Sequence, residues 1–245
     1  MSEQSESIAP PEPVKPASWW EDYIDIFYAP SSVFERRKDS GFGIPMLVVT
    51  LLISAIALAN HGAMQPILDA EFSRQTEAMM KANPQMTAEM MEKGRAIGEK
   101  IALFGGVIFI PIALLLIGLF LWVCGKFVGA KQTLGAAVMV ASFSYVPRIL
   151  EAVLNGVQLL VLDPSSLTSL NSLKLGVSRF MDPDTSSKIV LALVGRIDVF
   201  TIWTTVLLAI GLSVTGKVSR SQAAIGAVIL WFLGALVPLL GALRS

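Results

Sequence analysis

Charged residues are scarce in this chain, and that scarcity is the first guide to its class. Only 16% of the 245 residues are charged, whereas 53% are hydrophobic. A soluble domain usually carries about a quarter charged residues, so the long apolar runs indicate an integral membrane protein. Basic and acidic residues balance at 19 each. Without a basic excess, nucleic acid is not an expected partner.

Cysteine and histidine are almost absent. Cys124 and His61 are single residues of their kinds, far apart in the sequence. They exclude an intrachain disulfide and cannot supply the ligand set of a zinc site. No glycine-rich nucleotide-binding motif is present either. We therefore expect no metal, no cofactor and no enzymatic activity.

Five apolar runs are long enough to cross a bilayer. They predict an all-α membrane protein, a bundle of five transmembrane helices within residues 44–243. The remaining sequence predicts a disordered polar tail at 1–17, an amphipathic interfacial segment at 18–40 and a helical polar loop at 68–100. The detailed structure of 61–100 and 163–188 stays open. The expected spans are 44–60, 101–123, 134–162, 189–214 and 223–243.

The fourth span carries its own start signal. Asp182-Pro183 combines a favourable N-cap with a first-turn proline, and the helix that it opens is expected to run to Val214. A second weak motif, Gly125-x-x-x-Gly129, would permit close helix approach at the end of the second span.

Short basic segments predict the orientation. Acid-free loops next to the spans hold Lys126 with Lys131, and Lys217 with Arg220. Together with the basic run 36–38, they favour a cytoplasmic N-terminus and, after five crossings, a C-terminus outside. The expected location is a bacterial inner membrane.

The segment before the first span is rich in aromatic residues. A helical arrangement places most of them on one face, which suits either the lipid headgroup layer or packing on a partner. We expect an interfacial or partner-binding surface formed by Trp19, Trp20, Tyr23, Phe27, Tyr28 and Phe34.

Charges within the third and fourth spans are the main functional signal. At 1.5 Å per residue, they all fall at similar depth in the membrane, and they sum to zero. We expect Arg148 to pair with Asp198 and Glu151 to lie near Arg196. Tyr145 would cap this polar cluster with its hydroxyl, and Pro147 would break the backbone ladder. The expected intramembrane polar cluster is Tyr145, Pro147, Arg148, Glu151, Arg196 and Asp198.

With these residues and a few others, the chain resembles the Yip1 domain family of multi-pass membrane proteins. The similarity rests on Pro30 and Phe34, Ser144-Tyr145-x-Pro147, Asp198-Val199-Phe200-x-x-Trp203, Gly211-Leu212-Ser213 and the last helix from Ala223. The resemblance implies five transmembrane helices and a cytosolic N-terminus. Eukaryotic members are implicated in vesicle traffic, bind Rab-type GTPases and associate with one another. The short tail and long Met-rich first loop here favour a prokaryotic member.

Two functions follow from these patterns. The first is a scaffold or membrane-organisation factor, similar to trafficking proteins, in which the charges only fix helix packing. It would act through the bilayer and through membrane or cytoplasmic protein partners, including a second copy of the chain. The alternative is a transporter or lipid-handling protein with a polar cavity around Pro147, Arg148, Glu151 and Asp198.

Overall fold

The computed structural model describes residues 18–82, 85, 87–163 and 166–244. The expected disordered tail, 1–17, lies outside the described residues. In the described part, regular structure is helical, apart from an isolated bridge between Gly176 and Asp198. The elements are α1 (Asp22–Asp25), α2 (Pro30–Arg37), α3 (Gly43–Ala82), α4 (Ala88–Phe127), α5 (Leu134–Ser144), α6 (Pro147–Val161), η2 (Leu170–Leu173), η3 (Val177–Phe180), α7 (Lys188–Val194), α8 (Val199–Gly216) and α9 (Arg220–Arg244).

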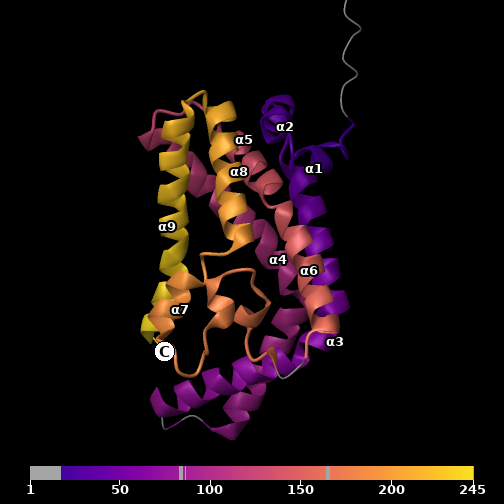
Figure 1. Cartoon of the computed structure of the whole chain (residues 1–245), viewed down its shortest axis with the longest axis vertical. Helices are drawn as coiled ribbons and strands as arrows, with labels where there is room; N and C mark the ends of the chain where they lie inside the picture. The colour runs from indigo at the N-terminus through magenta and orange to yellow at the C-terminus, as the bar shows by residue number, and fades with distance from the viewer. Residues whose placement is uncertain (1–17, 83–84, 86, 164–165, 245) are drawn as a thin grey trace, which may run out of the picture.

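Five helical segments of the described chain are long and apolar enough to cross a membrane. They are Gly43–Lys81, Glu89–Phe127, Leu134–Val161, Val199–Gly216 and Arg220–Leu243. Figure 1 shows them as an elongated bundle, with α1 and α2 at one end and α7 with the C-terminus at the other. The expected all-α membrane bundle is confirmed.

The first two spans are much longer than a bilayer requires. Helices α3 and α4 each contain 40 residues, or about 60 Å at 1.5 Å per residue, so their adjoining parts extend beyond the bundle at the α7 end (Figure 1). The helical first loop is therefore a continuation of the two membrane helices rather than a separate element.

Helix α5 forms the centre of the bundle, and every residue from Ala136 to Ser144 is buried. The third span is interrupted after it, as Pro147 predicted. Proline has no backbone N–H, so Pro147 cannot bond to the carbonyl of Phe143, four residues earlier. That carbonyl instead accepts a hydrogen bond from the amide of Val146, only three residues along, at 3.1 Å. Helix α6 then begins at Pro147, where the missing N–H has no consequence.

The fourth span differs from the prediction. A continuous helix over 189–214 is wrong, because α7 ends at Val194 and α8 starts at Val199. Asp198 is extended (φ −129°, ψ 156°), and its side chain accepts bonds from the amides of Phe200 and Thr201. Aspartate stabilises a helix N-terminus better than a helix interior, so the chain breaks there. Asp182-Pro183 opens a turn, and α7 begins only at Lys188.

Of the expected glycine pair, only Gly125 lies at a close helix contact, because a Cβ there would be 3.1 Å from Leu212 Cδ1 on α8. Gly129 follows α4 in a left-handed conformation (φ 82°) and has no heavy atom within 4 Å of its would-be Cβ. Gly118 on α4 makes a close approach to a helix backbone, since its Cβ would lie 2.6 Å from the Cα of Val138 on α5. Gly125-x-x-x-Gly129 is thus no helix-packing pair.

Candidate functional site

The start of α6 and the start of α8 bring the predicted charges together. Arg148 Nη1 lies 2.6 Å from Glu151 Oε2 and 3.9 Å from Asp198 Oδ1. Its Nη2 donates to the hydroxyl of Thr201 at 2.8 Å. The predicted Arg148–Asp198 ion pair is therefore present, although the shorter contact of Arg148 is with Glu151, one turn along its own helix.

Arg196 lies against α9, and its hydrogen bonds among the described residues go to that helix rather than to Glu151. Its guanidinium donates to the carbonyls of Trp231 and Gly234, both at 3.1 Å, and its Cζ lies 5.4 Å from the Trp231 ring centroid. Pro238 explains why Arg196 bonds to α9. Because proline has no backbone N–H, the Gly234 carbonyl lacks its usual partner within the helix and accepts from Arg196 instead. Gly234 also leaves room, since a Cβ there would lie 2.8 Å from Arg196 Nη2.

Tyr145 and Pro147 lie next to Arg148, at the break between α5 and α6. The ring of Tyr145 faces Arg148, with 5.9 Å between its centroid and the guanidinium carbon. The contact that the structure describes thus uses the ring face rather than the hydroxyl, a cation–π arrangement. Pro147 is buried and supplies the break between α5 and α6.

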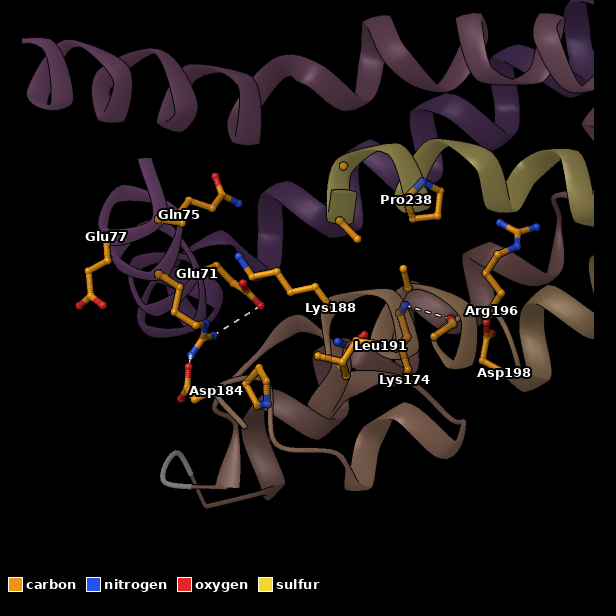
Figure 2. A pocket seen from close by; sticks show the side chains of 18 of the residues that line it. Glu71, Gln75, Glu77, Lys174, Asp184, Lys188, Leu191, Arg196, Asp198 and Pro238 are labelled. Atoms are coloured by element: carbon orange, nitrogen blue, oxygen red, sulfur yellow. Dashed lines mark hydrogen bonds and ion pairs between the residues drawn. The ribbon is translucent and has the colours of Figure 1, made fainter. Parts of the chain in front are cut away.

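A cavity of about 1150 Å³ opens beside this cluster. Figure 2 shows that it runs from Arg196 and Asp198, near the start of α8, to Glu71, Glu77 and Asp184 beside the extension of α3. We call these the α8 end and the α3 end. Leu191 and Pro238 add apolar surface between them. The charged side chains that line the cavity are Glu71, Arg74, Glu77, Lys81, Arg148, Lys174, Asp184, Lys188, Arg196 and Asp198.

The two ends differ in charge. The α3 end carries three acids and three cations, namely Glu71, Glu77 and Asp184 with Arg74, Lys81 and Lys188. The α8 end carries three cations and one acid, namely Arg148, Lys174, Arg196 and Asp198. The lining therefore has six cations and four acids, and its excess positive charge lies at the α8 end.

Lys174 is a site residue that sequence reasoning missed. It follows η2, and its Nζ donates to the carbonyl of Gly195 at 3.0 Å. Burial lowers the pKa of Lys174; Asp198 and Glu151 act to raise it, while Arg148 and Arg196 act to lower it further. The sequence shows Lys174 only as one cation in a polar connection, with no motif that links it to α8.

The extension of α3 is fastened to the connection that follows α6. Arg74 Nη2 donates to the carbonyl of Thr168 at 2.6 Å, and Glu71 accepts from the amide of Leu170 at 3.2 Å. Arg74 also lies 3.8 Å from Asp184. These contacts hold together the two segments that form the α3 end of the cavity.

The aromatic residues before the first span divide into exposed and packed groups. Trp19, Trp20 and Tyr28 are 59%, 51% and 71% exposed. Phe27 is 37% exposed but also meets the ring of Trp203 with 5.4 Å between centroids, and the partly buried Tyr23 meets Phe143 with 5.6 Å. The exposed surface is thus narrower than the sequence predicted.

Phe34 is a correction to the predicted surface. It is fully buried with Val33 on the inner face of α2, which packs on α8. Burial of so large an apolar side chain is favourable, so Phe34 anchors α2 and is not available to lipid or partner. Tyr23 is also partly enclosed, and burial raises its pKa to about 12.

A helical bundle with five apolar spans and charges inside it defines a multi-pass α-helical membrane protein. The chain belongs to the Yip1 domain family, whose model matches residues 24–241. It is 28% identical over 208 residues to the membrane protein YknW of Bacillus subtilis, and the aligned region covers 84% of this chain and 83% of the relative. No solved structure matches it significantly.

Proposed function

We propose that this Yip1 domain protein is a non-enzymatic membrane protein that handles a polar or amphipathic ligand, as a transporter or lipid-handling protein. One observation carries the proposal: the Arg148–Asp198 pair lies in the wall of a cavity of about 1150 Å³. A pair that only fixed helix packing would be enclosed between the two helices. Intramembrane charges that line a cavity commonly mark a ligand pathway.

The basic residues near the spans support an orientation for the cavity. Lys126 with Lys131, and Lys217 with Arg220, flank the ends of α4, α8 and α9 that lie opposite α7. By the positive-inside rule these ends are cytoplasmic, as is the N-terminus. The cavity then opens on the outer side of a bacterial inner membrane, and the C-terminus lies on that side.

Filling the cavity tests the proposal. Ala192 lines it on α7, whereas its neighbour Leu193 does not and is 42% exposed. We expect native mass spectrometry of the detergent-extracted protein to detect a retained small molecule. Ala192→Trp should lose most of that bound mass, because the indole occupies the cavity, whereas Leu193→Trp should keep it.

Thermal unfolding of both variants is the control for folding. Equal retention by two folded variants would contradict ligand handling in this cavity. Loss from both, with normal unfolding, would show that the molecule is bound elsewhere on α7.

A second function is supported by the exposed aromatic surface. Trp19, Trp20 and Tyr28 lie outside the packed core at the α1–α2 end, and Tyr28 donates to Asp25 at 2.6 Å. Tryptophan and tyrosine are common where proteins contact headgroups or other proteins. This surface suits a scaffold or membrane-organisation factor that contacts partners at the cytoplasmic face, including a second copy.

Proximity labelling tests that second function. The double variant Trp19→Ser/Trp20→Ser should lower the labelling of neighbouring proteins by about tenfold if these side chains anchor a partner. The reason is that anchoring aromatic residues contribute much of the binding free energy of an interface. Ile44→Ser is the matched control, because Ile44 is also an exposed apolar residue (65%) but lies in the first span. An unchanged set of neighbours would contradict a partner surface at Trp19 and Trp20.

A further inference from the structure

The α8 end of the cavity has more positive charge than its acids neutralise. Asp198 accepts bonds from two amides at the start of α8, and its carboxylate is 3.9 Å from Arg148. Glu151 forms its close contact, 2.6 Å, with the same arginine. Both acids are therefore engaged with Arg148 or with the helix N-terminus.

The other two cations have neutral partners. Arg196 donates to two α9 carbonyls, and Lys174 donates to the carbonyl of Gly195. Among the residues that the structure describes, no acid lies within 4.0 Å of either charged group. A lysine ammonium has three N–H donors, so Lys174 retains donors for a ligand.

Two arginine side chains at the same end are incompletely satisfied. The Nε atoms of Arg148 and Arg196 are buried, and neither has a hydrogen-bond partner within the described part of the chain. Anionic oxygens are the acceptors that guanidinium and ammonium groups bind most strongly, and the Arg148, Arg196 and Lys174 side chains line the cavity at this end. This end of the cavity is therefore suited to an anion with several oxygens.

The wall toward α9 suits an apolar part of the same ligand. Leu191, Pro238, Gly241 and Ala242 line it. On the same stretch of α9, Val237, Leu240 and Leu243 are exposed at 76%, 53% and 68%. An acyl chain that leaves the cavity over α9 would thus pass directly onto a surface that faces lipid.

We propose that the α8 end of the cavity binds a phosphate group through Lys174 and Arg196, as the headgroup of a phospholipid or as a soluble phosphate ester. This assignment rests on the proposed ligand-handling function and names its ligand class. The apolar wall of α9 favours the phospholipid, with the phosphate at the α8 end and the chains toward the bilayer.

Titration of the full-length protein in detergent tests the assignment, with binding followed by native mass spectrometry. The probes are phosphatidylglycerol, diacylglycerol with the same chains, and glycerol 3-phosphate. The variants are Lys174→Gln, which removes the charge, and Lys174→Arg, which keeps it. Lys93→Gln is the matched control, because Lys93 is on the exposed surface of α4 with its side chain 72% exposed.

We expect phosphatidylglycerol to bind at least tenfold more tightly than diacylglycerol. Lys174→Gln should weaken it by about ten- to a hundredfold, the range of one charge-assisted hydrogen bond, whereas Lys174→Arg and Lys93→Gln should not. Glycerol 3-phosphate binding with equal affinity and the same dependence on Lys174 would support the soluble ester as the source.

Other outcomes overturn the assignment. Equal binding of diacylglycerol and phosphatidylglycerol, both lost in Ala192→Trp, would reject the phosphate site and leave the ligand-handling cavity standing. Equal affinity of Lys174→Gln and the unaltered protein would also reject it. No binding of any probe, together with no retained mass that Ala192→Trp removes, would reject the site and the proposed function together.

Discussion

Replacing Asp22 with alanine is expected to destabilise the α1–α2 end of the protein by about 1–3 kcal/mol, the cost of leaving partly buried hydrogen-bond donors without their acceptor. Asp22 is 0% exposed. Its two carboxylate oxygens accept from Arg36 at 2.6 Å and from Arg37 at 2.5 Å. Without the carboxylate, two guanidinium groups lose their shared acceptor.

The consequence should be detachment of α1 and α2 from the bundle. Limited trypsin digestion would measure it directly, because detachment exposes the peptide bonds after Arg36 and Arg37. Asp39→Ala is the matched control: Asp39 is exposed in the same segment, and such surface changes usually alter stability by no more than about 0.5 kcal/mol. Equal cleavage rates for the two variants would show that Asp22 does not hold this end together.

Asp22 also shows where sequence reasoning reached its limit. The spacing of Trp20, Tyr23 and Phe27 predicted an aromatic face, and part of that face is exposed as expected. The ion cluster joins residues 14 and 15 positions apart across a turn between two short helices. No periodicity in a single sequence specifies that turn, so Asp22 could not be distinguished from the neighbouring acids.

The membrane spans were more predictable because each depends on a local property. Apolar length alone identified the five segments, and the missing N–H of Pro147 identified the break between α5 and α6. The break before α8 also had a local signal that was not used: an aspartate directly before an apolar run is typical of an N-cap. With Asp198 as an N-cap, the sequence predicts a helix that starts at Val199 rather than one continuous helix over 189–214.

The cavity depends on tertiary structure that no local signal describes. Its lining joins the far end of α3, the connection after α6, and α7 with α9. Arg196 illustrates the difficulty, since charge alone suggested Glu151 as its neighbour. The carbonyl that Pro238 leaves unpaired on another helix was a better partner, and only the packing of α7 against α9 makes it available.

Substituting glycines along α4 with alanine is expected to give opposite effects at two positions in the same helix. At Gly98 an added Cβ meets no atom within 4 Å, and the residue is exposed. Gly98→Ala should therefore stabilise the helix by up to about 1 kcal/mol through helix propensity alone. At Gly118 the same methyl group would lie 2.6 Å from the Cα and 2.9 Å from the backbone N of Val138.

A rotamer change cannot relieve that second contact, because the obstructing atoms belong to the backbone of α5. The two helices must separate, and α5 is the buried centre on which α4 and α8 pack. We expect Gly118→Ala to destabilise the protein by about 1–3 kcal/mol, the usual cost of overpacking. Unfolding of both variants in the same detergent measures the difference. Equal stability of the two variants would mean that α4 and α5 are not in close backbone contact at Gly118 and Val138.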